Sequence, residues 1–145
     1  MENTMTFVRG FRLSDCAAVT ELLRETLSEA CYEETIEAFG RQLSWDGELV
    51  LVAEADGQVA GVIIGTIDND CGYCYRIAVR SGYRRRGIGR QLIQALRRRF
   101  ELRQVKKVLV SVDEHNASLL PFYESLGFDQ SSLERSGRQL SIVNG

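Results

Sequence analysis

A turn rich in glycine and arginine is the part of the sequence whose residue types most directly suggest chemistry. It follows an apolar stretch that ends at Val79, and its arginines stand at positions 80, 84, 85, 86 and 90. Gly87 and Gly89 allow the backbone to bend sharply and to point successive N–H groups outwards. A helix that begins at Ile88 or Gly89 adds unpaired amides and the positive end of its dipole. The turn therefore predicts an anion site, most naturally for a diphosphate.

The widespread phosphate-binding motifs do not describe this turn. The P-loop string G-x-x-x-x-G-K-S/T does not occur in the sequence. The dinucleotide fingerprint G-x-G-x-x-G fits only in part, because Leu92 stands where a third glycine or an alanine is required. A basic turn that is merely solvated is the alternative interpretation.

The composition is that of an ordinary globular protein, and the length predicts a single domain over residues 1–145. The net charge of −2 conceals two halves of opposite sign. Residues 1–70 contain 14 acidic and 4 basic side chains, whereas residues 71–145 contain 6 acidic and 14 basic ones. This division suits a protein that binds a polyanion with one half and a cation with the other. An acidic patch near Tyr32 is either a site for a cationic substrate or a solvated helix face, and it comprises Glu29, Glu33, Glu34 and Glu37.

Other classes of protein fit less well. No apolar run reaches membrane-spanning length, and the first residues lack a signal-peptide core, so we expect a cytoplasmic protein that contacts no membrane. The arginines at 97–99 lack interleaved aromatic residues, so we expect no nucleic-acid partner. Cys71 and Cys74 form a lone C-x-x-C, and His115 is the only histidine, which favours reduced thiols and no metal site. A redox protein that uses this cysteine pair is the alternative.

The elements that must position the turn predict a mixed α/β fold. Strands are expected at residues 5–12, 48–55, 58–67, 73–79 and 107–112, and helices at 16–27, 33–43 and 88–100. Ser14 or Asp15 supplies an N-cap for the first helix. The dipeptide Asp56-Gly57 predicts a hairpin between the second and third strands. Two apolar strands that flank the third helix imply a right-handed crossover and a parallel pair.

Alternation along the strand at 73–79 predicts the residues on each of its faces. One face would carry Tyr73, Tyr75, Ile77 and Val79, and the other Cys74, Arg76 and Ala78. An arginine inside a strand needs either a partner or a ligand, and we expect Arg76 to pair with a carboxylate.

The last third of the chain predicts a short helix followed by a hairpin. Pro121 fits the first turn of a helix that Ser118 caps, which leaves Asn116 outside the helix with its amide free to bind a ligand. Gly127 ends this helix as its C′ residue. Residues 128–144 are predicted to form two short strands around Ser136-Gly137.

Two motifs resemble those of the GNAT superfamily of N-acetyltransferases. The segment Arg84-Arg85-Arg86-Gly87-Ile88-Gly89 matches the acetyl-CoA motif R/Q-x-x-G-x-G/A. The segment Tyr123-Glu124-Ser125-Leu126-Gly127-Phe128 matches a second motif, Y-E-x-x-G-F, in the expected order. The order of the predicted elements is also that of the superfamily, so the chain is identified as a member.

The resemblance implies a mixed, mostly antiparallel sheet of seven strands flanked by about four helices. The strands at 73–79 and 107–112 would splay apart to admit the pantetheine arm of acetyl-CoA, the expected cosubstrate. The Val79 amide would polarise the thioester carbonyl. The residues implied to bind acetyl-CoA are Ile77, Val79, Arg84, Arg85, Arg86, Gly87, Ile88, Gly89, Arg90, Asn116 and Phe122.

The resemblance also implies an N-acetyltransferase that moves the acetyl group to a primary amine by direct attack in a ternary complex, without a metal. Tyr123 matches the general acid that protonates the departing thiolate. The general base stays open, because the strand at 73–79 contains no glutamate. Glu54, Asp113 or Glu114 could act through water, Tyr75 could line a proton path, or the amine could arrive neutral.

The acceptor stays open between a small cationic amine and a protein N-terminus. A non-catalytic CoA-binding module that senses or regulates is the alternative function, and a monomer and a homodimer both fit the sequence.

Overall fold

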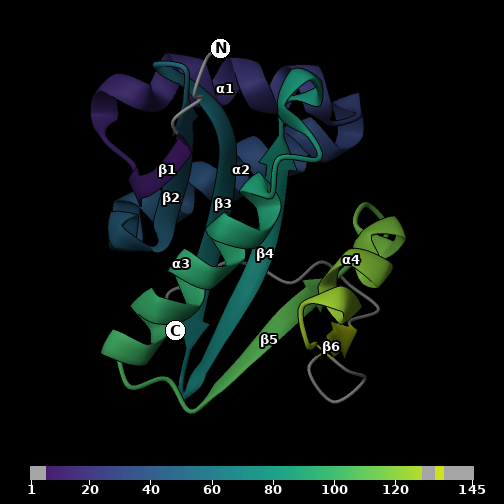
Figure 1. The fold of residues 1–145 in the computed structure, drawn as a ribbon. Helices are drawn as coiled ribbons and strands as arrows, with labels where there is room; N and C mark the ends of the chain where they lie inside the picture. Colours follow the sequence, from purple (N-terminus) through teal and green to yellow (C-terminus); the bar gives the residue numbers. More distant parts are fainter. Residues whose placement is uncertain (1–5, 129–132, 136–145) are drawn as a thin grey trace.

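The structure is a computed structural model that describes residues 6–128 and 133–135 (Figure 1). Its strands are β1 (Thr6–Gly10), β2 (Val50–Ala55), β3 (Gln58–Asp68), β4 (Cys71–Val79), β5 (Lys107–Val112) and β6 (Leu133–Arg135). The α-helices of the described part are α1 (Cys16–Thr26), α2 (Glu29–Asp46), α3 (Ile88–Leu102) and α4 (Leu120–Ser125). No helix in these two ranges is both long enough and apolar enough to cross a membrane.

The six strands form one mixed sheet in the order β1-β2-β3-β4-β5-β6. Neighbours from β1 to β4 are antiparallel, whereas β5 is parallel to β4 and β6 is parallel to β5. The predicted parallel pair is thus confirmed. Seven strands are not confirmed, because the described strands number six. The predicted turn at Ser136-Gly137, and the strand after it, lie outside the described residues.

Two tight turns set the register of β2, β3 and β4. Asp56 and Gly57 both have positive φ, 55° and 77°, as a type I′ hairpin requires. Asn69, with φ of 57°, starts the turn into β4. Asparagine, aspartate and glycine tolerate this left-handed region better than most residues do. Ala55 pairs with Gln58 across the loop, so the predicted hairpin at Asp56-Gly57 is confirmed.

Helix α1 starts at Cys16 with Asp15 at its N-cap position, as predicted, but the cap bond of α1 and the start of α2 differ from the predictions. The Asp15 carboxylate does not cap α1; it accepts the Arg12 N–H at 2.8 Å and pairs with Arg9 at 2.8 Å. The second helix begins at Glu29 rather than at residue 33, because Ser28 Oγ accepts the Cys31 N–H at 3.2 Å and so caps it.

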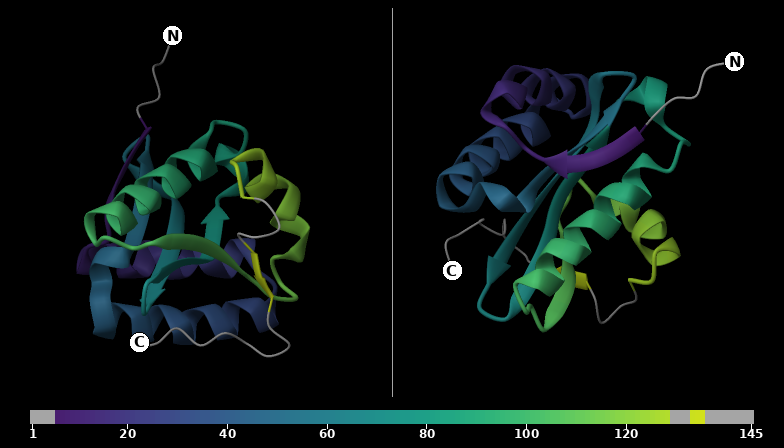
Figure 2. Two further views of the ribbon diagram at one scale, coloured as in Figure 1. Left: turned by 90° about the horizontal axis from the view of Figure 1, so that it is seen from below. Right: turned by 60° about the vertical axis from the view of Figure 1, so that its left-hand side comes forward.

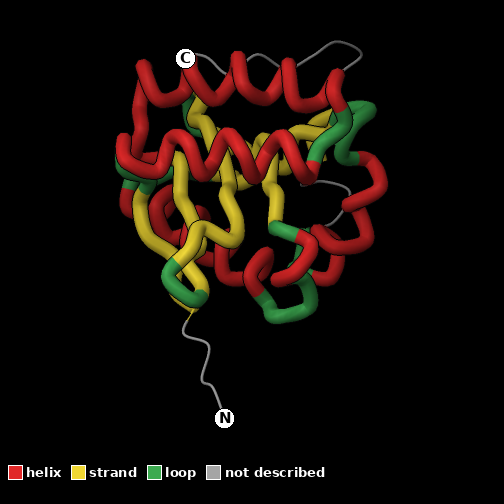
Figure 3. The backbone as a smooth tube through the Cα atoms, turned by 90° about the horizontal axis from the view of Figure 1, so that it is seen from above, coloured by secondary structure: helices red, strands yellow, loops and turns green. Residues whose placement is uncertain are grey.

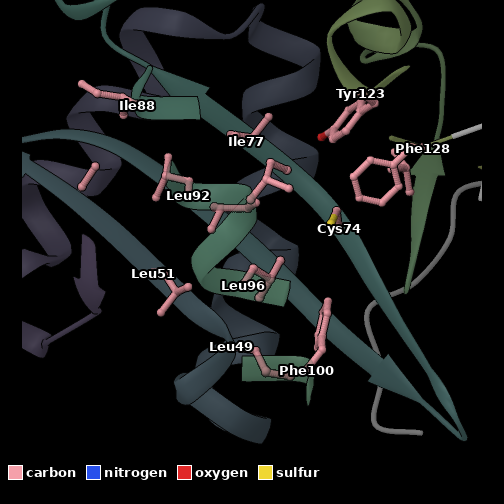
Figure 4. Packing of buried hydrophobic residues seen from close by; sticks show 14 of the residues in the cluster. Leu49, Leu51, Cys74, Ile77, Ile88, Leu92, Leu96, Phe100, Tyr123 and Phe128 are labelled. Atoms are coloured by element: carbon pink, nitrogen blue, oxygen red, sulfur yellow. The ribbon is translucent and has the colours of Figure 1, made fainter. Parts of the chain in front are cut away.

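The hydrophobic core has two layers, one on each face of the sheet (Figure 2). One layer lies under α3 and α4, and Figure 4 shows Leu92, Leu96 and Phe100 of α3 against the sheet. The other layer lies under α1 and α2 and includes Leu22 and Phe39. Figure 3 shows the sheet between these helical layers. The helical spacing predicted for α3 is confirmed, since its apolar residues are buried on one side.

A β-bulge in β4 makes the predicted faces of this strand wrong. Ile64 pairs with Arg76 and Gly65 with Cys74, so Tyr75 is an additional residue in β4. A bulge interrupts the alternation of side chains. As a result, Tyr75 packs with the layer under α1 and α2, whereas Ile77 and Cys74 belong to the opposite layer.

Gly72 of β4 gives a test of the packing under α3. A Cβ atom at Gly72 would lie 2.8 Å from ring carbons of Phe100, whereas a Cβ at Gly40 of α2 would meet nothing within 4 Å. We expect Gly72→Ala to destabilise the fold by about 1–3 kcal/mol through overpacking. Gly40→Ala, the control, is expected to stabilise it by about 0.5–1 kcal/mol, because alanine favours a helix. Urea denaturation of both variants tests this, and equal effects would contradict it.

Candidate active site

A cleft of about 640 Å³ lies beside the part of β4 that no longer pairs with β5. The ladder between the two strands ends at Cys74 and Val110, at the bulge, and beyond it the strands diverge (Figure 1). The strands therefore splay as expected. The end of β4, the glycine–arginine turn, the start of α3 and the segment that leads into α4 form the walls of the cleft.

Most residues that the resemblance assigns to acetyl-CoA line this cleft. They are Ile77, Val79, Arg84, Arg85, Gly87, Ile88, Gly89, Arg90 and Phe122. Arg86, Asn116 and Tyr123 are not among its lining residues. The fold adds residues that the sequence analysis did not place there, among them Thr26, Leu27, Tyr83, His115 and Ser118.

The backbone of the glycine–arginine turn leaves the first amides of α3 open to a ligand. Gly87 is the N-cap of α3 and adopts the left-handed conformation, with φ of 77°. Because glycine has no side chain, no cap bond occupies the first-turn amides. Arg85 also has a positive φ, 69°, which costs energy for a residue with a Cβ atom. Open amides at the positive end of a 15-residue helix fit a phosphate group.

The arginines of the turn have different partners. Arg84 Nε donates to the Val79 carbonyl at 3.3 Å, and Arg84 lines the cleft. Arg86 instead lies 3.8 Å from the Asp56 carboxylate and stacks over Tyr83. Arg86 therefore contributes charge near the cleft but does not form its wall.

Gly89 brings α3 close to α4. A Cβ atom at this position would lie 2.9 Å from Cζ of Phe122. The motif's second glycine is thus required for close approach, and it lets the Phe122 ring form part of the cleft wall.

Tyr123 lies beneath the cleft wall with an unsatisfied hydroxyl group. Its side chain is 1% exposed, packs edge-on against Phe122 and Phe128, and points its hydroxyl towards β4 (Figure 4). That hydroxyl has no hydrogen-bond partner within the described part of the chain. Burial raises the pKa of Tyr123 well above its ordinary value, so the phenol keeps its proton at neutral pH. A buried hydroxyl without a partner is available to donate a hydrogen bond to a bound group.

Asn116 does not have the free amide that was expected. Its Oδ1 accepts the Asp113 N–H at 2.9 Å, and its Nδ2 donates to the Ser111 carbonyl at 2.7 Å. The side chain is 3% exposed and holds the loop after β5 in place. The predicted cap at Ser118 is also wrong, because Ser118 lies inside a 3-10 turn (Ala117–Leu119) that leads into α4. Pro121 lies in the first turn of α4 and Gly127 has φ of 98° beyond its end, as predicted.

Arg76 pairs with a carboxylate, as predicted, at the centre of a buried polar cluster. Its guanidinium group lies 3.2 Å from Asp113 Oδ2 and 4.0 Å from Glu34 Oε2, and it donates to Thr35 Oγ1 at 2.9 Å. It also stacks over the ring of Tyr75, the bulge residue. The bulge thus directs Tyr75 and Arg76 to the side of the sheet that α2 covers.

His115 lies in the cleft, a position that the sequence did not indicate. It lines the cleft, and its Nε2 lies 3.2 Å from Glu34 Oε2. The carboxylates considered as bases are placed less favourably, and none of them lines the cleft. Glu54 pairs with Arg9 at 2.7 Å, Asp113 pairs with Arg76, and Glu114 is exposed. The contact between His115 and Glu34 joins residues far apart in the sequence, so no local pattern could have revealed it.

Within the described residues the cysteines form no disulfide bond, and Cys74 of the C-x-x-C pair is deeply buried. All four are free thiols, and burial raises the pKa of Cys74 to about 12, which makes it a poor nucleophile. Among the described residues, no three histidine, cysteine or carboxylate side chains are grouped as metal ligands would be.

Comparisons with solved structures give the same fold. The ribosomal-protein-S18-alanine N-acetyltransferase from Escherichia coli is 26% identical, with 86% of this chain and 78% of that chain covered and a TM-score of 0.65. The PaiA N-acetyltransferase from Thermoplasma acidophilum, solved with coenzyme A, is 20% identical, with 86% and 90% covered and a TM-score of 0.70.

A third similar structure is the diaminobutyrate acetyltransferase EctA from Paenibacillus lautus, solved with L-2,4-diaminobutyric acid and coenzyme A. It is 21% identical, with 86% of this chain and 75% of that chain covered and a TM-score of 0.66. The sequence profile of the Acetyltransferase (GNAT) family matches residues 16–128, which is most of the sequence. The chain therefore belongs to the GNAT family of acetyltransferases.

Proposed function

We propose that this chain is a single catalytic domain that transfers the acetyl group of acetyl-CoA to a primary amine by direct attack in a ternary complex. The observation that carries the proposal is the cleft beside β4, which has open helix amides at one end and the orphaned Tyr123 hydroxyl beneath its wall. Bound acetyl-CoA supplies the activated acetyl group and a thiolate leaving group.

Different residues of the chain bind different parts of acetyl-CoA. The first amides of α3, with Arg84, Arg85 and Arg90, hold the pyrophosphate. The backbone of Ile77 and Val79 binds the pantetheine arm, and Phe122 packs against it. Asn116 acts through the loop that it anchors, and Arg86 adds charge from behind the turn.

Tyr123 donates a proton at its hydroxyl oxygen to the departing sulfur. Burial raises the pKa of Tyr123, so the phenol holds its proton at neutral pH and is available as a donor. The burial of Tyr123 excludes water from its hydroxyl group, which strengthens this hydrogen bond.

Calorimetric titration with acetyl-CoA, followed by an assay of CoA release, tests the proposal. The amine probes are L-2,4-diaminobutyrate, spermidine and a short peptide with an N-terminal alanine. Binding of acetyl-CoA with release of CoA on addition of one amine is the expected result. Binding without turnover of any amine would favour a CoA-binding module without catalysis, and no binding would overturn the proposal.

Two arginines of the turn give a sharper binding test. We expect the double variant Arg84→Ala/Arg85→Ala to raise the Kd for acetyl-CoA about tenfold or more, because each arginine supplies charge-assisted hydrogen bonds. The loss should shrink at high salt, where charge attraction is screened. Arg98→Ala, on the exposed side of α3, is the control, and an equal loss there would contradict a local pyrophosphate site.

A further inference from the structure

The amine needs a proton acceptor that the proposed binding residues do not supply. An alkyl amine is mostly protonated at neutral pH and cannot attack until it loses a proton. β4 carries no glutamate, and neither Glu54, Asp113 nor Glu114 lines the cleft. His115 lines the cleft, and an imidazole is the side chain that most often acts as a general base.

The backbone and the ring of His115 each have an acidic neighbour. Its backbone N–H donates to Asp113 Oδ1 at 2.8 Å, and its Nε2 lies 3.2 Å from Glu34 Oε2 on α2. A carboxylate at this distance favours a ring proton on Nε2, and therefore a lone pair on Nδ1. The side chain is 13% exposed, so little of its surface faces water.

Three charged side chains lie around His115. Glu34 of α2 contacts His115 directly. Arg76 of β4 and Asp113 of the loop that contains His115 lie next to this contact. Asp113 lies closer to Arg76, at 3.2 Å, than Glu34 does, at 4.0 Å. Asp113 therefore balances Arg76, and the charge of Glu34 is left to attract an arriving ammonium group.

The same cluster is close to the proposed acid. The charges of Arg76 and Asp113 both act on the buried phenol of Tyr123. His115 and Ile77 of β4 both line the cleft, and Figure 4 shows the Tyr123 hydroxyl directed towards Ile77.

We propose that His115, oriented by Glu34, is the general base that deprotonates the acceptor amine, an inference that rests on the proposed acetyl transfer. One N–H bond of the ammonium breaks and a new N–H bond forms on Nδ1 of His115. The freed lone pair then bonds to the thioester carbonyl carbon while the C–S bond breaks. The second proton leaves the nitrogen for the thiolate by way of Tyr123, and the imidazolium returns its proton to solvent.

Nitrogen-15 NMR tests the geometry directly, because His115 is the only histidine in the chain. In CoA-bound protein the ring is expected to carry its proton on Nε2, and its signals are expected to shift when L-2,4-diaminobutyrate, spermidine or the alanine peptide is added. A proton on Nδ1 would leave no lone pair facing the amine and would overturn the inference.

Kinetics test the role in turnover. For the probe that the wild-type protein acetylates best, His115→Gln should lower kcat/KM by about 10²–10⁴-fold near neutral pH. That deficit should shrink as pH rises towards the pKa of the amine, because a neutral amine needs no base. The Kd for acetyl-CoA should not change, which also shows that the variant is folded.

Two variants on α2 distinguish the specific contact between Glu34 and His115 from a general effect of the acidic residues of this helix. Glu34→Gln removes the partner of His115, whereas Glu33→Gln removes an equal charge from an exposed neighbour. A clear loss of kcat/KM only in Glu34→Gln is expected. Equal losses of kcat/KM in the two glutamate variants would overturn the inference and leave the proposed function intact. A deficit in His115→Gln that does not depend on pH would do the same. If the wild-type protein acetylates no probe, the proposed function fails and the inference fails with it.

Discussion

Tyr123→Phe is expected to remove most of the turnover and yet leave the fold at least as stable as before. Loss of the general acid should lower kcat by about 10²–10⁴-fold. Removal of a buried hydroxyl that has no partner should keep the free energy of unfolding unchanged or raise it by about 1–3 kcal/mol, the usual penalty for such a group. A functional residue that weakens the fold is a common feature of active sites.

The pH dependence of stability gives a second readout. The pKa of Tyr123 is raised in the folded state, so above about pH 10 the unfolded chain loses a proton that the folded chain keeps. Stability of the wild-type protein should therefore fall as pH rises through this range. The stability of Tyr123→Phe should fall less steeply with pH. Some fall should remain, because burial also raises the pKa of Tyr75.

Tyr75→Phe is the matched control, since it removes a buried hydroxyl that does have a partner, Arg76, at 3.3 Å. It should lower stability by about 1 kcal/mol. Calorimetric titration with acetyl-CoA, CoA-release kinetics and urea denaturation of both variants test the prediction. Full turnover in Tyr123→Phe would rule out the general-acid role, and a loss of stability like that of Tyr75→Phe would show that its hydroxyl has a partner.

Local chemistry was sufficient to predict the parts of the site that lie close together in the sequence. The hairpin at Asp56-Gly57, the apolar side of α3 and the turn at Gly87 each depend on residues within one turn or one helix. The Ser28 cap was equally local, and its serine followed by Glu29 is an ordinary helix start that we overlooked.

What could not be predicted depends on pairing between distant segments. The bulge at Tyr75 arises from the register of β4 on β3, and alternation within one strand cannot show an additional residue. The amide of Asn116 was expected to be free because its partners, the Asp113 N–H and the Ser111 carbonyl, become neighbours only when the loop closes. The contact between Glu34 and His115 requires α2 to lie across the end of β5, which no motif specifies.

Arg76→Met is expected to destabilise the fold by about 3–5 kcal/mol, the largest effect on stability among the variants considered. Arg76 is 3% exposed, and its removal would leave the mostly buried Asp113 carboxylate and the Thr35 hydroxyl without their cationic partner. Urea denaturation measures the loss. Arg41→Met breaks the exposed pair with Glu37 on α2 and should cost only about 0.3–0.5 kcal/mol.

The double variant Arg76→Met/Asp113→Asn decides whether the penalty comes from the uncompensated charge. Asparagine keeps an oxygen that can accept the N–H groups of His115 and Asn116, which now bond to Asp113. If buried charge causes the penalty, this variant should recover more than half of the stability that Arg76→Met loses, because neutral partners need no counter-ion. Losses that simply add would show instead that Arg76 stabilises the fold by packing on Tyr75 and α2, with Asp113 as a separate anchor of the His115 loop.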